Sequence, residues 1–140
     1  MYYYISKFMQ QSIKYEVDVI LPENIGISIY DLNIVFGNLF DNAIENVIKS
    51  DNSRIVIDIK YIGHALYTSI ANTYDGKIRD EGNVILSRKE GKHGYGLDNI
   101  RRIADKYKGN VNIQYSGEMF VVGVVMYVWE CVLSLSPEFQ

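Results

Sequence analysis

The spacing of apolar residues along the chain predicts three helices and five strands. Apolar positions recur at steps of three and four in the helical segments, whereas they alternate with polar positions, or form a continuous run, in the strand segments. The predicted helices cover about residues 2–13, 32–48 and 94–107, and the predicted strands cover about residues 15–21, 54–62, 66–71, 111–115 and 119–129. Most of these strands follow one another closely enough to pair as hairpins, which leaves the helices to cover one face. We therefore expect an α+β fold, a two-layer sandwich of a mixed, mostly antiparallel sheet with helices on one face.

The most unusual pattern is a polar stripe in the second predicted helix. Four polar residues, spaced by four, three and one positions, share one side of this otherwise apolar helix: Asn38, Asn42, Glu45 and Asn46. Asparagine is a poor helix former, because its side-chain amide competes for backbone hydrogen bonds. A solvated helix face usually carries Lys and Glu, whereas this stripe is rich in amides and has apolar residues on both flanks. The pattern therefore favours a stripe that faces a cleft over one that faces only solvent.

Composition and charge limit the class of protein. The chain has 140 residues, of which 48% are hydrophobic and 22% charged, values typical of one globular domain. Its net charge of -3 lacks the basic excess of nucleic-acid-binding proteins, so we expect no nucleic-acid partner. The single cysteine, Cys131, excludes an intrachain disulfide and indicates a reducing compartment. Residues 119–135 are almost all apolar, but this segment is short for a membrane span, contains Glu130 and is rich in valine, so it predicts a buried strand instead.

A charged segment, residues 72–93, separates the predicted hairpin from the last predicted helix. A loop of this length inside a compact domain is typically a lid or a binding loop. It leads into Gly91-Lys92-His93-Gly94-Tyr95-Gly96, in which the glycines are spaced by three and two residues. A glycine-rich turn lets backbone N–H groups approach phosphate oxygens, and the N-terminus of the following helix adds a partial positive charge. Taken alone, the turn fits a flexible connection equally well, and it matches neither the P-loop nor the dinucleotide-binding fingerprint.

Together, the asparagine stripe and the glycine-rich turn predict a site for a magnesium–nucleotide complex. An asparagine carbonyl oxygen can coordinate a hard cation, and Mg²⁺ takes few protein oxygens because phosphates and waters supply the rest. Lys92 and His93 beside the turn are suited to offset phosphate charge, although each residue by itself is equally expected in a solvated loop.

Three segments resemble the motifs of the GHKL ATPases, the superfamily with the Bergerat fold. Residues 38–46 resemble its asparagine box, residues 70–78 resemble its first glycine box and residues 93–100 its second, all in the family order. The resemblance extends from about Glu16 to Trp129. Within the superfamily, the chain most resembles the ATP-binding catalytic domain of bacterial sensor histidine kinases. The most similar subgroup includes the quorum-sensing, peptide-responsive kinases of Gram-positive bacteria.

The resemblance implies roles for individual residues. It implies that Asn42 coordinates Mg²⁺ and that Asn38, one turn earlier, assists at the metal or the phosphates. Asn72 stands where the wider family has an aspartate that receives the adenine amino group of ATP, and Gly76 backs the adenine pocket. Residues 75–93 are implied as the lid over ATP. The remaining residues implied in nucleotide binding are Lys92, His93, Gly94, Tyr95, Gly96 and Leu97.

Two residues depart from the family pattern. Asn72 replaces the aspartate, and Tyr74 replaces the first glycine of its box. A neutral amide makes a weaker hydrogen bond to the adenine amine than a carboxylate does, although its carbonyl oxygen still accepts. We therefore expect a Kd for ATP of about 0.1–1 mM, or roughly -5 kcal/mol.

Asn38 separates two kinds of activity within the superfamily. The members that hydrolyse ATP carry a glutamate at this position, as the base that activates water. An amide cannot take up a proton, which favours phosphoryl transfer through positioning and charge neutralisation. The implied acceptor is a histidine, yet neither His64, in a predicted turn, nor His93, in the glycine-rich turn, lies in a phosphoacceptor context.

The resemblance thus implies the catalytic end of a longer, membrane-anchored receptor, located in the cytoplasm. Its implied partners are its own phosphoacceptor and dimerisation domain, absent from this chain, and a downstream response regulator, and we expect the isolated domain to be a monomer. The expected division is an N-terminal helix or linker at residues 1–15, the ATP-binding catalytic domain at 16–130 and a tail at 131–140. One alternative is a degenerate nucleotide-binding or interaction module without kinase activity, because of Asn72 and Tyr74. A second alternative, an ATPase that hydrolyses ATP, is disfavoured by Asn38.

Overall fold

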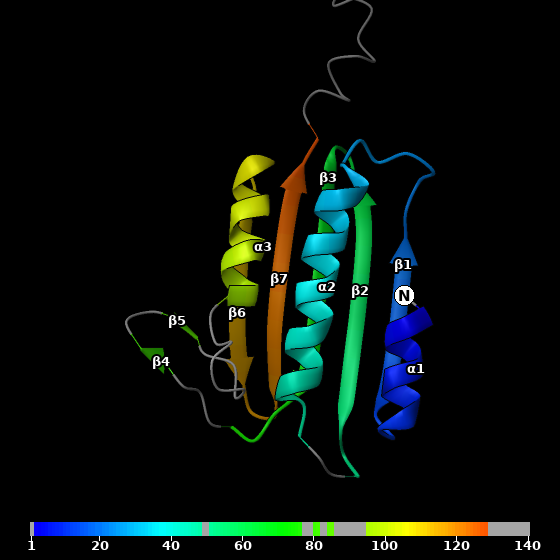
Figure 1. Ribbon diagram of the computed structural model, residues 1–140, viewed down its shortest axis with the longest axis vertical. Coiled ribbons are helices and arrows are strands. Elements are labelled where there is room, and N and C mark those ends of the chain that lie inside the picture. Colours follow the sequence, from blue (N-terminus) through cyan, green and yellow to red (C-terminus); the bar gives the residue numbers. More distant parts are fainter. Residues whose placement is uncertain (1, 49–50, 77–79, 82–83, 86–94, 129–140) are drawn as a thin grey trace, which may run out of the picture.

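A computed structural model describes residues 2–48, 51–76, 80–81, 84–85 and 95–128. These residues form helices α1 (Tyr2–Gln10), α2 (Ile29–Asn46) and α3 (Tyr95–Lys106), and strands β1 (Lys14–Ile20), β2 (Arg54–Ile62), β3 (Ala65–Thr73), β4 (Asp80–Glu81), β5 (Val84–Ile85), β6 (Asn110–Ser116) and β7 (Met119–Tyr127). Helices α2 and α3 lie side by side over one face of the main sheet, and α1 lies next to β1 (Figure 1). The predicted two-layer α+β fold is confirmed.

The main sheet is mixed, with strand order β1-β2-β3-β7-β6. β1 and β2 are parallel, whereas the other neighbouring strands are antiparallel. A tight turn cannot join parallel neighbours, so α2 serves as the crossover between β1 and β2. The short strands β4 and β5 pair with each other in a separate hairpin. This order makes β3, which carries Asn72, the central strand.

The core lies between the sheet and the two long helices. Apolar side chains alternate along the strands, so that Ile55, Ile57 and Ile59 of β2 are at most 1% exposed. Leu39 of α2 and Ile100 of α3 belong to the same buried cluster. The segment that raised the question of a membrane span forms β7 up to Tyr127, as expected, and none of the helices in the described ranges is long and apolar enough to cross a bilayer.

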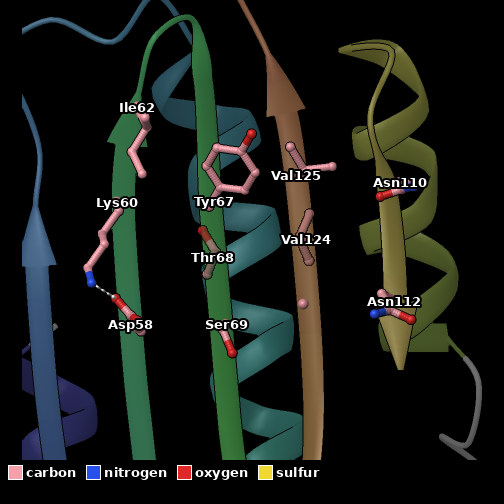
Figure 2. A pocket seen from close by; sticks show the side chains of 11 residues that line it. Asp58, Lys60, Ile62, Tyr67, Thr68, Ser69, Asn110, Asn112, Val124 and Val125 are labelled. Carbon is pink, nitrogen blue, oxygen red and sulfur yellow. Dashed lines mark ion pairs between the residues drawn. The ribbon is translucent and has the colours of Figure 1, made fainter. Parts of the chain in front are cut away.

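The opposite face of the sheet carries a hollow of about 330 Å³. Gly123, which has no side chain, is one of the residues that line it. Tyr67, Val125 and Asn112 also line it (Figure 2). Since the helices cover the other face, this hollow is separate from the asparagine stripe of α2.

Helix α2 and strand β3 extend further than the sequence indicated. α2 begins three residues early, at Ile29, because the Ser28 side chain caps it by accepting a hydrogen bond from the Tyr30 N–H at 3.2 Å. β3 continues to Thr73, so Asn72 is a strand residue and not part of the following loop. The Thr73 hydroxyl accepts from the Arg54 N–H at 3.0 Å, which extends the pairing with β2.

Helix α3 ends in a Schellman motif. The Lys108 N–H donates to the Asp105 carbonyl at 3.0 Å, and the Gly109 N–H donates to the Ala104 carbonyl at 2.9 Å. Lys108, with φ of 58°, takes the left-handed position that glycine usually fills. Gly109 follows this residue, and it is required for a different reason. A Cβ at Gly109 would lie 1.7 Å from the Val125 carbonyl oxygen, so the glycine is needed for close approach to β7.

Candidate functional site

Helix α2 presents different faces to its neighbours. Leu39 and Ala43 face the sheet and are 1% exposed. On another side, the Tyr4 ring of α1 lies 4.6 Å from the Phe40 ring. Burial and the nearby Asp41 carboxylate raise the pKa of Tyr4 to about 12. The asparagine stripe occupies another side, on which Asn38 lies toward α3, and its four residues are all partly buried. The stripe is therefore neither core nor a fully solvated surface.

Asn38 of this stripe lies against the first turn of α3. Its Nδ2 donates to the Ile34 carbonyl at 2.7 Å, which fixes the side chain along the helix. A Cβ built on Gly96 would lie 3.3 Å from the Asn38 Oδ1, closer than most such contacts. The structure thus brings together one residue of the asparagine stripe and one of the glycine-rich turn.

Asn42 is oriented by a neighbour on the same helix. The Asn46 Nδ2 donates to the backbone carbonyl of Asn42 at 2.7 Å and to its side-chain Oδ1 at 3.1 Å. A carboxamide oxygen has two lone pairs, so this hydrogen bond leaves one of them for a cation. Asn46 therefore holds the Asn42 carboxamide in a defined orientation that fits coordination of a hard metal ion.

Asn72 lies at the end of the central strand, close to the end of α2. The Ile48 N–H, just beyond α2, donates to the Thr73 carbonyl at 3.0 Å, and the Asn72 Nδ2 donates to the same carbonyl at 3.2 Å. Asn72 is 1% exposed and pairs with Ile55 and Phe120, so its side chain is on the helical side of the sheet. The Nδ2 of Asn72 is thus engaged with the main chain at the end of β3.

Two of the residues that the sequence singled out, Tyr74 and Gly76, lie in the segment that follows β3. Gly76 is exposed and has φ of +80°, a conformation that explains the glycine. Tyr74 is 8% exposed, and its ring lies 5.9 Å from that of Phe120, edge to face. Tyr74 therefore contributes to the core.

The remaining predicted residues are at or before the start of α3. Leu97 is 4% exposed and belongs to the core, so only its backbone is suited to contact a ligand. Tyr95 is the first residue of α3, and its side chain is outside what the structure describes. Three residues lie outside the described ranges: Lys92, His93 and Gly94.

Sequence reasoning missed a second contact between α2 and α3. Asp31, 6% exposed in the first turn of α2, accepts a hydrogen bond from the Lys106 Nζ at 2.9 Å and another from the Tyr107 hydroxyl. The Tyr107 hydroxyl in turn accepts from the Ser28 N–H at 3.2 Å. The sequence did contain one signal, because Asp31 precedes Asn38 by seven residues, or two helical turns, and so continues the asparagine stripe.

These contacts shift the pKa values of the three ionisable groups. The hydrogen bond from Lys106, and then that from Tyr107, hold the pKa of Asp31 below its ordinary value of 3.8. The hydrogen bond to Asp31 raises the pKa of Lys106. Burial, and then the hydrogen bond to Asp31, raise the pKa of Tyr107.

The lowered pKa of Asp31 predicts a pH-dependent contribution to stability. A carboxylate with a lowered folded-state pKa stabilises the fold above its unfolded-state pKa, and this contribution is lost as the pH falls through the folded-state value. We expect Asp31→Asn to lower the free energy of unfolding by about 1 kcal/mol near pH 7, a modest effect because the Lys106 side chain is itself 60% exposed. The difference should shrink below about pH 3.8, the ordinary pKa. Urea denaturation of both proteins across this range measures it, and a difference that stays constant down to about pH 2.5 would contradict the charge-based explanation.

Comparison with known proteins places the chain in a family. Residues 27–127 match the family model described as the GHKL domain. Because this match covers most of the chain, the protein belongs to the GHKL domain family, and the resemblance drawn from its three motifs is confirmed.

The individual relatives are a sensor protein and histidine kinases. The chain is 28% identical over 130 residues to the sensor protein CitS of Bacillus subtilis (strain 168), a match that covers 84% of this chain and 24% of CitS. The chain thus spans about a quarter of the length of this curated relative. Among solved structures, the catalytic domain of histidine kinase ThkA in a nucleotide-free form has a TM-score of 0.70 at 18% identity, over 90% of this chain and 85% of that one. Acinetobacter baumannii histidine kinase AdeS has a TM-score of 0.68 at 18% identity, over 91% of this chain and 60% of that one. The chain therefore has the fold of histidine kinase catalytic domains.

Proposed function

We propose that the chain is the Mg-ATP-binding catalytic domain of a sensor histidine kinase, which transfers the γ-phosphoryl group of ATP to a histidine on a separate phosphoacceptor domain. The observation that carries the proposal is the close approach of Asn38 and Gly96, since it joins the asparagine stripe to the glycine-rich turn. Membership of the GHKL family and similarity to the sensor protein CitS support it.

The described residues fit the parts of a magnesium–nucleotide complex. The Asn72 Oδ1 is suited to accept a hydrogen bond from the adenine amino group of ATP, and Gly76 would lie behind the adenine ring. The N-terminus of α3, at Gly96 and Leu97, offers backbone N–H groups and a partial positive charge to phosphates. Asn42 offers one oxygen to Mg²⁺, which would neutralise phosphate charge. In the part of the chain that the structure describes, no three His, Cys, Asp or Glu side chains could hold a metal, so phosphates would supply most of the other ligands.

Two residues favour this function over its alternatives. Asn38 carries an amide that donates to the Ile34 carbonyl and cannot act as a base, which supports phosphoryl transfer in place of hydrolysis. Tyr74, one of the two departures behind the degenerate alternative, is packed against Phe120 in the core. Its ring therefore need not occupy an adenine pocket.

The wider setting forms part of the proposal. In it, the domain acts in the cytoplasm as part of a membrane-anchored receptor of the peptide-responsive subgroup, with its own dimerisation domain and a response regulator as partners. The domain itself would span residues 16–130, with residues 75–93 as its lid, and would be a monomer when isolated. Residues 1–15 would be the preceding helix or linker and residues 131–140 a tail.

Titration of the chain with ATP, with and without Mg²⁺, tests the proposed function. We expect saturable, magnesium-dependent binding with a Kd of about 0.1–1 mM. With [γ-³²P]ATP, the chain should then label a histidine on the helical dimerisation domain of a related kinase, supplied in trans. The absence of saturable, magnesium-dependent binding below about 5 mM would favour the degenerate module. Steady phosphate release by the isolated chain that Asn38→Ala abolishes would favour an ATPase.

A further inference from the structure

Helices α2 and α3 are tied together at two places along their contact. At the start of α3, Gly96 lies against Asn38. At the end of α3, Lys106 and the adjoining Tyr107 bind Asp31. The two helices therefore run in opposite directions, as Figure 1 shows, and the second contact lies two turns of α2 away from Asn38. We call this second contact the clamp; it consists of Ser28, Asp31, Lys106 and Tyr107.

The clamp is built from directional bonds at two helix ends. A buried carboxylate is unfavourable unless it is hydrogen-bonded, so Asp31, 6% exposed, requires its partners on α3. The Tyr107 hydroxyl is bonded on both sides, since it donates to Asp31 and accepts from the N–H of Ser28, the residue that caps α2. Asp31 also lies at the positive end of the α2 dipole and Lys106 at the negative end of the α3 dipole. The clamp therefore fixes the position of α3 along α2 more strictly than apolar contacts alone would.

The position of α3 determines the contact at its other end. Gly96 and Lys106 are ten residues apart, which corresponds to about 15 Å of helix. A regular helix transmits a shift along its axis with little loss, so movement at Lys106 also moves Gly96. There the fit is tight, because a Cβ on Gly96 would be only 3.3 Å from the Asn38 Oδ1. A displacement of α3 by even part of an ångström would therefore change how its first N–H groups meet a ligand held by Asn38 and Asn42.

We propose that Tyr107 and Asp31 are positioning residues for the nucleotide phosphates, which they control by holding α3 in register with α2. This inference rests on the proposed function, because it presumes that the start of α3 contacts phosphate. Neither residue would touch the ligand.

A Tyr107→Phe variant tests the clamp most directly. It keeps the ring and its packing and removes only the hydroxyl. We expect the Kd for Mg-ATP to rise about 5- to 10-fold at a temperature at which thermal melts show the variant to be fully folded. Lys106→Met removes one of the two hydrogen bonds to Asp31. Because the Lys106 side chain is 60% exposed, we expect the Kd of this variant for Mg-ATP to rise only about 2- to 3-fold. This second variant covers the case in which Tyr107→Phe folds poorly.

Two controls separate positioning from general stability. Tyr115→Phe makes the same chemical change at a tyrosine of β6 that is 50% exposed, and should leave the Kd within about twofold. Ile103→Val removes one methyl group from the buried side of α3, and should lower Tm without changing the Kd. If Ile103→Val weakens Mg-ATP binding as much as Tyr107→Phe does, or if neither clamp variant weakens it, the proposal is wrong.

A comparison of ligands adds a readout that loss of folded protein cannot imitate. AMP lacks the β- and γ-phosphates, so its Kd, measured by NMR titration, should differ by less than about twofold between wild type and Tyr107→Phe. Equal weakening of AMP binding and Mg-ATP binding would overturn the inference, because partial unfolding weakens the binding of both ligands alike.

If the wild type binds neither ligand, the proposed function fails instead. The clamp is then tested by NMR in the ligand-free state. Tyr107→Phe should shift the Gly96 amide resonance more than Ile103→Val does. An unchanged resonance in Tyr107→Phe would refute the clamp.

Discussion

An Asn42→Ala variant should show no saturable binding of Mg-ATP up to about 10 mM, a loss of at least about 100-fold or roughly 2.7 kcal/mol. The expected loss is large because alanine removes the one carboxamide oxygen that Asn46 holds in place for Mg²⁺. Without the metal, the triphosphate would bring its charge unneutralised to the first turn of α3. Isothermal titration calorimetry with and without Mg²⁺ measures the effect. In the absence of Mg²⁺, wild type and variant should bind ATP equally weakly.

Asn33 supplies the matched control for this experiment. It lies on the same helix, is exposed and is outside the asparagine stripe. Asn33→Ala therefore makes the same change in helix propensity, and it should alter the Kd by less than about twofold. If Asn42→Ala binds Mg-ATP within about threefold of wild type, the assignment of the metal to Asn42 is wrong.

The sequence predicted the elements of the fold better than their arrangement. Residues 54–62 were predicted as a strand with the limits that β2 has, since alternation at period two is a local signal. The order β1-β2-β3-β7-β6 depends on two pairings between strands that are distant along the chain, β1 with β2 and β3 with β7. Such pairings follow from how the apolar faces pack together, and periodicity carries no information about partners.

The candidate site shows the same division between local and distant information. The helical spacing of Asn38 and Asn42 is local and placed both on one side of α2, as the structure has them. The bond between Asp31 and Tyr107 joins residues 76 positions apart. Local spacing places each of these residues on a helix but does not identify its partner on the other helix. The polar bond could be predicted only after α2 and α3 were known to lie together.

We expect Gly109→Ala to lower the free energy of unfolding more than Asp31→Asn or Ile103→Val does, although Gly109 lies outside the proposed nucleotide site. The new Cβ would lie 1.7 Å from the carbonyl oxygen and 2.6 Å from the carbonyl carbon of Val125, both backbone atoms of β7, which is paired with a strand on each side. Neither atom can turn aside as a side chain would, so the Schellman turn or β7 has to move. We expect the free energy of unfolding to fall by about 3 kcal/mol or more and Tm by roughly 10 °C. Urea and thermal denaturation followed by circular dichroism measure both values.

Gly123→Ala is the matched control. Gly109 packs against β7 and Gly123 lies within β7, but a Cβ at Gly123 would meet no close neighbour. Its Cβ would be 3.8 Å from the Asn112 carbonyl oxygen and 4.0 Å from that of Thr68, both ordinary contacts, and it would point into the hollow on the open face of the sheet. Alanine also restricts the unfolded chain, so this variant should match the wild type or gain up to about 1 kcal/mol. Equal losses in the two variants would mean that glycine flexibility, and not the close approach of Gly109 to Val125, explains the effect. Tight packing of the α3 terminus on β7 would then no longer account for Gly109.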